Sequence, residues 1–320
     1  MKKMEKYLWA FLQSHYEEKE ITEIMMESNE KLISVIIPIY KPNKEYLSET
    51  IKSIQDQNYE NYEVLLIVDG DAADTKEIID GLKDDRFRIL INTKGKGLPY
   101  SLNRGFKESK GEYILRMDAD DICLSERFAK QVEYLDTHPD IDMVSTFAET
   151  FGAVTMLYKS YTAYKDINAE LLFKNPIVHP TVSFRKSAVV KYNLQYSTGE
   201  SEDYRIWIDM AYGHHCRIEV IPEVLLKYRM HEGQATVVKK SSIEDMEEKI
   251  SKGILNKLGI KLSSEGYKAF NKLRNAEKIK ISDLIKIFEM RKELRNKLPT
   301  DISKKTFDKL INKMILKKLA

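Results

Sequence analysis

Three aspartates lie close together in the segment Met117-Asp118-Ala119-Asp120-Asp121, which directly follows a stretch typical of a buried strand, residues 111–116. Helix-forming residues, 125–134, come after this acidic cluster, so we expect Asp118 and Asp120 at a transition from strand to loop. Because strand side chains alternate with a period of two, the two carboxylates are expected to point the same way. Carboxylates are preferred ligands of Mg2+ and Mn2+, which complete their coordination with water and substrate phosphates. The cluster therefore predicts a site for a divalent cation and a nucleotide diphosphate; the alternative is an acidic surface turn.

The segments that position this cluster alternate between strand-like and helix-like patterns. Apolar runs are followed by amphipathic segments, a repeat that is typical of βαβ units and of an open, doubly wound sheet. Ligands bind at the carboxyl ends of the strands in such a sheet. Asp69 also follows a strand-like run, so we expect it to face the same crevice as Asp118 and Asp120. The expected strands are 32–40, 63–68, 87–92 and 111–116, and the expected helices are 46–57, 74–83, 100–109 and 125–134.

A basic loop, residues 93–98, is a further candidate for contact with an anion. It contains Lys96 and Gly97, but it lacks the GxxxxGK[ST] spacing of a Walker A motif. We interpret Lys96 and Gly97 as contacts to the base or the phosphates of a nucleotide.

Further short motifs follow one another along the chain: Val35-Ile36-Ile37-Pro38-Ile39-Tyr40, Glu63 to Gly70, Asn103-Arg104-Gly105, Gly111 to Asp121, Leu124-Ser125-Glu126-Arg127, Lys130-Gln131, His138-Pro139-Asp140-Ile141, His179-Pro180-Thr181, Glu202 to Trp207 and Tyr228-Arg229-Met230-His231. Their order resembles that of the family 2 glycosyltransferases with the GT-A fold. The resemblance covers residues 32–235 and implies an α/β fold with a mixed, mostly parallel sheet flanked by helices. It also implies metal-dependent transfer of a hexosyl or N-acetylhexosaminyl group, with inversion, from a UDP-sugar to a glycan or lipid-linked acceptor. Members of this kind build bacterial surface polysaccharides such as capsule or O-antigen.

The resemblance assigns a donor-binding set to the nucleotide-binding half of the chain. Asp69 is expected to recognise the uracil ring, although Val68 stands where the family usually has another aspartate. A turn or helix-capping role is the alternative for Asp69. Arg127 is expected near the donor phosphates or the sugar, with a surface ion pair as its alternative. The remaining donor-binding candidates are Pro38, Ile39, Tyr40, Lys96, Gly97, Asn103, Asp118 and Ala119.

Metal ligands and a general base follow from the same resemblance. Asp120 is expected to bind Mn2+ or Mg2+, and His231 to reach the metal or the diphosphate, unless it is an exposed loop histidine. Asp203, with Glu202 beside it, is expected to deprotonate the acceptor hydroxyl. Because this pair begins an amphipathic segment, a helix N-cap is the alternative role for Asp203. His179 and Trp207 are candidates for the acceptor or sugar pocket, with core packing as the alternative for Trp207.

The composition indicates a cytoplasmic protein. The chain has 320 residues, of which 42% are hydrophobic and 32% charged, and no apolar run approaches the length that spans a bilayer. The apolar core near the N-terminus is too short for a convincing signal peptide. Two cysteines, without the spacing of a zinc site, indicate free thiols in a reducing compartment. We divide the chain into an N-terminal helical extension (1–31), a catalytic domain (32–238, with a nucleotide-binding half, 32–121, and an acceptor half, 122–238) and a basic helical C-terminal region (239–320).

In the C-terminal region, Lys and Arg outnumber Asp and Glu by about two to one. Amphipathic segments at 242–258, 264–275, 282–296 and 303–319 predict helices. These helices are expected either to pack against the catalytic domain or to present a basic amphipathic surface to anionic lipid at the inner face of the membrane. Nucleic acid is not an expected partner, because the region lacks stacking aromatics and a reading motif.

Two other kinds of protein remain as alternatives. One is a nucleotide-sugar-binding or scaffold protein without turnover, against which the set Asp118, Asp120, Asp203 and His231 argues. The other is a nucleotidyltransferase, whose Gly-rich, Arg-Lys signature near the first strand is missing.

Overall fold

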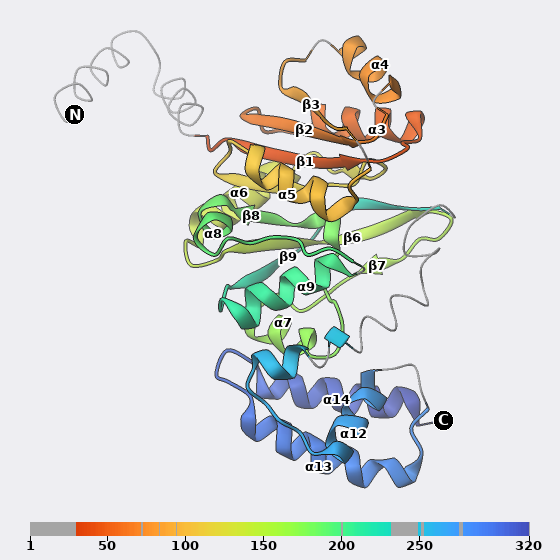
Figure 1. Cartoon of the computed structure of the whole chain (residues 1–320), viewed down its shortest axis with the longest axis vertical. Helices are drawn as coiled ribbons and strands as arrows, with labels where there is room; N and C mark the ends of the chain where they lie inside the picture. Colours follow the sequence, from red (N-terminus) through yellow and green to blue (C-terminus); the bar gives the residue numbers. More distant parts are fainter. Residues whose placement is uncertain are drawn as a thin grey trace, which may run out of the picture.

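The structure is a computed structural model, which describes residues 30–319 except 72, 83, 94, 200, 232–248, 251–252 and 275–277. The helices expected within 1–31, and most of the helix expected at 242–258, lie outside the described residues. A nine-stranded sheet forms the centre, in the order β3-β2-β1-β4-β8-β6-β9-β5, with β7 paired to β6 (Figure 1). The strands are β1 (Ile33–Ile39), β2 (Tyr62–Asp69), β3 (Phe87–Asn92), β4 (Tyr113–Arg116), β5 (Ile122–Cys123), β6 (Met143–Gly152), β7 (Leu157–Tyr158), β8 (Ser183–Arg185) and β9 (Ile218–Met230).

The parallel half of the sheet is β3-β2-β1-β4, and it contains the strands that the sequence predicts. The second half is mixed: β8 runs antiparallel to both β4 and β6, whereas β6 and β9 are parallel. The expected GT-A class, with a mixed and mostly parallel sheet between helices, is confirmed. A simple doubly wound order describes only the first half, because β8 enters the sheet next to β4 in the opposite direction.

Alternation along the strands divides the core into two layers. On β1, Ile33, Val35 and Ile37 belong to one layer, whereas Ile36 belongs to the other. The first layer packs on helices α3 (Lys44–Gln55), α4 (Ala73–Leu82) and α6 (Arg127–Thr137). The second packs on α5 (Leu98–Glu108), α7 (Tyr164–Leu171) and α9 (Glu202–Ile208). Both faces of β1, β2 and β4 are therefore buried, which explains their nearly continuous apolar sequences, whereas β3 at the edge of the sheet is partly exposed.

The remaining elements are short. A 3-10 turn, η1 (His179–Thr181), precedes β8; helix α8 (Lys186–Lys191) follows it, and a π-helical turn, η2 (Asp209–Gly213), continues α9. In the part of the chain that the structure describes, no helix is long and apolar enough to cross a bilayer.

The C-terminal helices α12 (Ser264–Arg274), α13 (Ile281–Lys297) and α14 (Lys304–Lys318) agree closely with the predicted boundaries. They pack below α7 and α9 (Figure 1) and join the second core layer through residues such as Phe270 and Phe307, which contact Phe173. Arg274 Nε donates to the carbonyl of Phe173 at 2.9 Å. Packing against the catalytic domain, one of the two expectations for this region, is therefore observed.

Candidate active site

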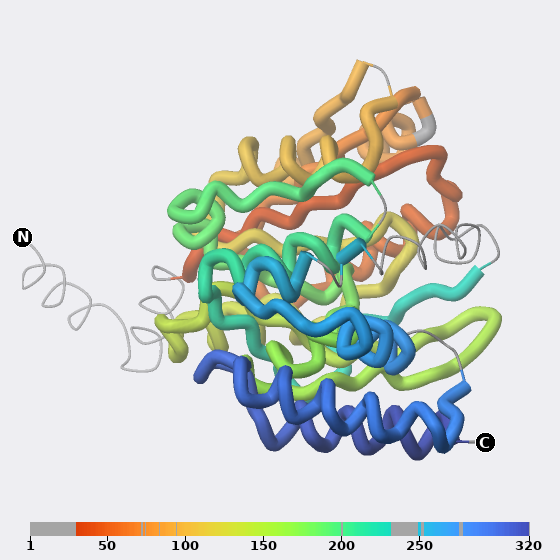
Figure 2. Tube along the Cα trace, turned by 60° about the horizontal axis from the view of Figure 1, so that its bottom comes forward, coloured from red at the N-terminus to blue at the C-terminus, as the bar shows by residue number. Residues whose placement is uncertain are grey.

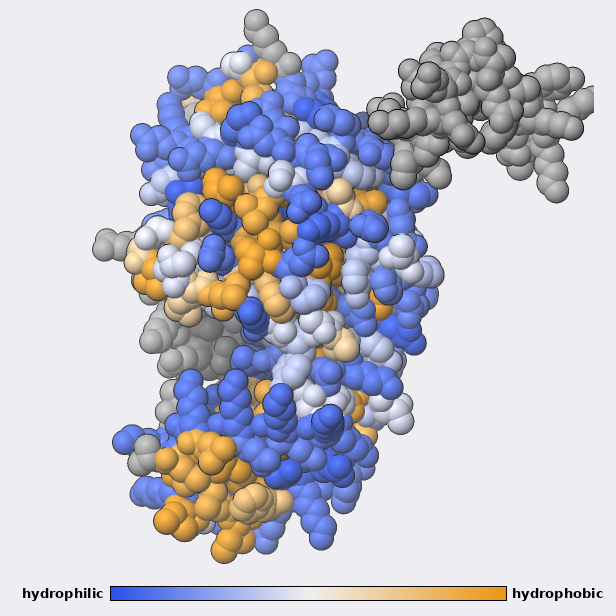
Figure 3. Space-filling model, turned by 180° about the vertical axis from the view of Figure 1, so that it is seen from behind, coloured by the Kyte–Doolittle hydropathy of each residue, from blue (hydrophilic) through white to orange (hydrophobic). Residues whose placement is uncertain are grey.

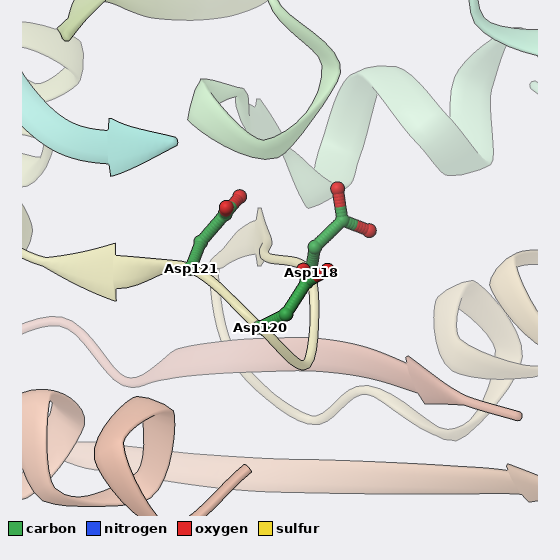
Figure 4. Close-up of side chains that lie close together, drawn as sticks. All are labelled: Asp118, Asp120 and Asp121. Atoms are coloured by element: carbon green, nitrogen blue, oxygen red, sulfur yellow. The ribbon is translucent and has the colours of Figure 1, made fainter. Parts of the chain in front are cut away.

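The acidic cluster forms the turn between β4 and β5. Figure 4 shows Asp118, Asp120 and Asp121 on this turn, and carboxylate oxygens of all three lie within 4.8 Å of one another. The sequence argument expected strand alternation to align Asp118 with Asp120. Both residues lie after the end of β4, however, and it is the turn that brings them together and adds Asp121.

Arg116, the last residue of β4, pairs with Asp118. Its guanidinium makes two bonds to the carboxylate, at 2.8 and 2.5 Å, and the residue is only 3% exposed. Burial raises the pKa of Asp118, Arg116 opposes this effect, and Asp120 and Asp203 add to it. Asp118 is thus held in one orientation by a buried positive charge.

Asp121 is wholly buried, and only one of its carboxylate oxygens has a partner in the described structure. Oδ1 accepts the backbone N–H of Arg229 at 2.9 Å, whereas Oδ2 is without one. Burial raises the pKa of Asp121 well above its usual range, and the neighbouring Asp118 and Asp120 contribute. A buried, unpaired carboxylate oxygen is costly unless a cation or a proton satisfies it.

The end of β9 holds the acidic turn from the other side. Arg229 Nε donates to the carbonyl of Asp120 at 2.7 Å, and the same guanidinium pairs with Glu49. His231 follows, with Nε2 at 2.9 Å from Oδ2 of Asp120. The motif Tyr228-Arg229-Met230-His231 therefore meets the acidic cluster, and the contact of His231 with a metal or a diphosphate remains a prediction.

These residues fit a divalent cation. Three converging carboxylates and one imidazole nitrogen are oxygen and nitrogen ligands of the kind that Mn2+ accepts, and the unpartnered oxygen of Asp121 adds a reason for a cation at this point. The ion itself stays a proposal.

Asp203 lies in the first turn of α9, near the acidic turn. Asn175 Nδ2 donates to Oδ2 of Asp203 at 2.7 Å, and the backbone N–H of Tyr204 donates to Oδ1 at 2.7 Å. Burial raises the pKa of Asp203, whereas these two hydrogen bonds lower it. The formal N-cap is Ser201, whose side chain makes no capping bond. Asp203 is thus a shielded carboxylate that two hydrogen bonds hold in one orientation, with a pKa above its usual value.

The Asn175 contact gives a testable pH dependence. If Asp203 is the general base that the resemblance implies, only its ionised carboxylate can take the acceptor proton, so activity should be lost as the pH falls through its raised pKa. Asn175→Ala removes a hydrogen bond that lowers this pKa, so the acid limb of the kcat/KM profile should move to higher pH. Profiles of parent and variant with a saturating donor check this. Asn296→Ala, an exposed position on α13, serves as the control, and an acid limb that stays in place in Asn175→Ala would separate Asp203 from proton transfer.

His179 lies beside Glu202, the neighbour of Asp203 in the first turn of α9. Its Nε2 is 3.0 Å from the hydroxyl of Tyr196, and its Nδ1 is 4.0 Å from Oε1 of Glu202. Burial and the charge of Arg116 lower its pKa well below the usual range, so the ring is neutral at physiological pH. Asn103 bonds in both directions with the backbone of Tyr196, at 2.8 Å each, and so fixes the segment that carries this tyrosine.

Asp69 organises the basic loop. Its carboxylate accepts the backbone N–H groups of Lys96 and Gly97, at 2.8 to 2.9 Å, and the amide of Asn92 at 3.0 Å. These bonds lower the pKa of Asp69, although burial opposes them. Gly97 has φ +87° at the N-terminus of α5, which favours glycine. Asp69 thus orders this loop, which is a structural role of the kind that the sequence left as its alternative, and its contact with uracil remains a prediction.

Burial argues against the expected site roles of Arg127 and Trp207 and leaves that of Ile39 a prediction. Arg127 is 0% exposed, and its guanidinium donates hydrogen bonds to the carbonyl of Arg116 and to Gln131. It therefore stabilises the end of β4 from inside the core and is not accessible to a sugar nucleotide. Trp207 is also 0% exposed and packs edge-on against His179, so it belongs to the core and not to a sugar pocket. The side chain of Ile39 is 1% exposed and faces the core, which leaves only its backbone for a ligand. Tyr40, in contrast, is 64% exposed.

Sequence reasoning did not assign roles to Arg116, Asn175 and Tyr196. A charged residue at the end of an otherwise apolar strand was an available signal for Arg116, because buried arginines are almost always paired. Asn175 and Tyr196 lie outside helices and strands, and their positions follow from the packing of distant segments.

Comparison with known proteins decides the family. The sequence model of glycosyl transferase family 2 matches residues 34–193, half of the chain. The chain belongs to this family. Among its relatives, the O-antigen biosynthesis glycosyltransferase WbnJ of Escherichia coli is 33% identical over 210 residues, which cover 62% of this chain and 80% of WbnJ. The UDP-Glc:alpha-D-GlcNAc-diphosphoundecaprenol beta-1,3-glucosyltransferase WfaP of Escherichia coli is 25% identical over 226 residues, 65% of this chain and 81% of WfaP.

A solved structure supports the fold. S. aureus TarS, residues 1–349, in complex with UDP-GlcNAc superposes with a TM-score of 0.60 at 18% sequence identity. The match covers 89% of this family 2 chain and 88% of that chain. At this identity the likeness concerns the fold alone.

Proposed function

We propose that this family 2 glycosyltransferase moves a sugar from a UDP-sugar to a glycan or lipid-linked acceptor, with inversion at the anomeric carbon. The observation that carries the proposal is the pairing of two features at one site. An acidic turn with a buried, unpartnered carboxylate oxygen lies close enough to Asp203 for the charge of Asp203 to add to the raised pKa of Asp118. The acidic turn suits a metal-bound diphosphate, and the carboxylate of Asp203 suits a general base.

In the proposed mechanism, Asp118, Asp120 and Asp121, with His231, would hold Mn2+ or Mg2+. A bound divalent cation supplies positive charge that stabilises the departing diphosphate. Arg116 keeps Asp118 in place, and Arg229 fixes the turn through its bonds to Asp120 and Asp121. The turn is therefore preorganised, so that little reorganisation is required when charge develops.

Asp203 accepts the proton of the acceptor hydroxyl as that oxygen attacks the anomeric carbon. Asn175 and the first turn of α9 orient its carboxylate. With one base and no partner nucleophile in the proposal, the sugar moves in a single in-line displacement. Glu202 and the neutral His179 line the same region and are candidates for acceptor contact.

The proposal of UDP as the donor nucleotide and of a glycan or lipid-linked acceptor is supported by the donor-binding residues and by the names of two relatives. Asp69, Lys96 and Gly97 form the proposed uracil contact, and Pro38, Tyr40 and Ala119, at or after the ends of β1 and β4, are further proposed donor contacts. WfaP is named for UDP-Glc and a diphosphoundecaprenol acceptor, and WbnJ for O-antigen biosynthesis, so we propose a role in the synthesis of a bacterial surface polysaccharide. The free, buried thiols of Cys123 and Cys216 suit a cytoplasmic location.

A panel of UDP- and GDP-sugars tests this function. With Mn2+ present, one UDP-sugar should be hydrolysed slowly to UDP without acceptor, and calorimetry should give tighter binding of UDP than of GDP. Asp69→Ala should reduce that preference, because it removes the carboxylate that orders the base-contacting loop. Equal affinities for UDP and GDP would overturn the uracil assignment, and binding without UDP release from any donor would favour a protein that binds nucleotide sugars without turnover.

A further inference from the structure

An exposed apolar stripe runs along α13, on the side of the helix that faces away from the core. Ile281, Ile285 and Phe288 are 80%, 69% and 50% exposed, and their spacing of four and three residues places them on one face. The opposite face buries Ile287, Met290 and Leu294. Leu316 on α14 is 75% exposed, and the N–H of Ile279 bonds to the carbonyl of Lys318, which brings the end of α14 beside the start of α13. We call these four exposed residues, Ile281, Ile285, Phe288 and Leu316, the C-terminal patch.

The surroundings of this patch are basic. Residues 239–320 contain 22 Lys and Arg against 11 Asp and Glu, whereas residues 1–238 contain 30 against 39. Exposed lysines flank the stripe at positions 280, 292, 313 and 317. Figure 3 shows an apolar area on the C-terminal helices, at the lower left, bounded by hydrophilic surface. Apolar contact with a basic rim complements an anionic lipid surface, whereas the like-charged rim of a second copy would repel it.

A second exposed apolar segment lies in the hairpin that joins β6 to β7. Val154, Met156, Leu157 and Tyr158 are 39 to 52% exposed. The N–H of Ala153 bonds to the carbonyl of Met230, which sets the start of this hairpin beside His231 at the active site. Figures 1 and 2 show the hairpin, the end of β1 and the end of α14 on the same side of the molecule.

We infer that this side of the protein docks on an anionic lipid bilayer through the C-terminal patch, with the β6–β7 hairpin as a second apolar contact. Phe288, Ile285, Ile281 and Leu316 would enter the boundary between headgroups and acyl chains, while the flanking lysines extend toward lipid phosphates. The carboxyl ends of the strands, where the donor site lies, would then face the layer that holds a lipid-linked acceptor. The orientation of the donor site toward a lipid-linked acceptor rests on the proposed function, whereas the docking itself does not.

Vesicle flotation with the full-length protein tests the docking. The parent should float with vesicles of phosphatidylcholine and phosphatidylglycerol, and much less with phosphatidylcholine alone. The double variant Ile285→Glu/Phe288→Glu should partition at least about tenfold less, because both side chains are exposed and lose their apolar insertion. Val190→Glu, at an equally exposed apolar position (68%) on α8, is the matched control and should float like the parent. Lys292→Gln/Lys313→Gln/Lys317→Gln should lose the dependence on the anionic lipid.

Three results would overturn the inference. They are a parent that does not float with anionic vesicles, a double variant that floats as well as the parent, and a C-terminal patch that proves to be a dimer contact. The last would appear as a dimer in light scattering without lipid, which Ile285→Glu/Phe288→Glu converts to a monomer. Hydrolysis of the UDP-sugar in solution should be equal in the parent and in all these variants, so a failure of docking and a failure of the proposed transfer are distinguished.

Discussion

Asp120→Ala should abolish sugar transfer and weaken the binding of UDP in the presence of Mn2+. The carboxylate of Asp120 is one of three that converge on the turn, and it is the one that contacts His231. Its removal takes away both a candidate metal ligand and the partner that orients the imidazole. Because the departing diphosphate then lacks a neutralising charge, we expect no measurable transfer.

Calorimetry with UDP, with and without Mn2+, measures the binding part of this effect, and chelation by EDTA should reproduce it in the parent. Asp85→Ala is a matched control, because Asp85 is exposed in the turn before β3, away from the acidic turn. Full activity in EDTA, or in Asp120→Ala, would remove the metal from the proposal.

The parallel half of the fold was predictable because each strand carries its own signal. The runs before Tyr40, Asp69 and Asp118 are apolar on both faces, and helical periodicity lies between them, so local sequence was sufficient. The long strands β6 and β9 were not predicted. Their burial alternates irregularly and their register shifts between Thr146 and Ala148, so no simple period is present.

The residues of the candidate site also divide into those that local sequence predicts and those that it does not. Asp118, Asp120, Asp203 and His231 were predictable because each belongs to a short motif, and the structure brings the first two together with His231. Arg127 and Trp207 were misplaced because a motif gives a residue's position along the chain and not the direction of its side chain. Both begin or continue helices whose inward faces point into the core, and both are fully buried there. Asn175 had no local signal, since its role depends on a contact with a residue 28 positions away.

The boundaries of the C-terminal helices were also predictable from local sequence. Their caps and apolar spacings are local, for example the side chain of Ser303, which accepts the N–H of Thr306 at the start of α14. The two apolar faces of α13 could not be ranked from sequence, because a helix with apolar residues on both sides does not indicate which side meets the core.

Asp203→Asn should separate a general base from a structural carboxylate. Asp203 could instead serve only to accept hydrogen bonds from Asn175 and from the first turn of α9. In that case an asparagine would keep most of the activity, because its side chain has nearly the same volume and its amide oxygen can accept one of the two bonds. If Asp203 is the base, transfer should fall by about 10²- to 10⁴-fold, the usual contribution of general-base catalysis, because an amide does not take the acceptor proton.

The affinity for UDP and the melting temperature of Asp203→Asn should stay close to those of the parent, since the metal turn is intact and the substitution removes a buried charge. Glu202→Gln, on the same turn of α9, is the informative comparison. A loss in Glu202→Gln larger than that in Asp203→Asn would assign the base to Glu202, whereas more than about a tenth of parental transfer in both variants would place the base elsewhere. Donor hydrolysis should fall less than transfer in Asp203→Asn, because the proton of an attacking water can pass to bulk solvent and does not require Asp203. That split between hydrolysis and transfer is the result that a purely structural role does not produce.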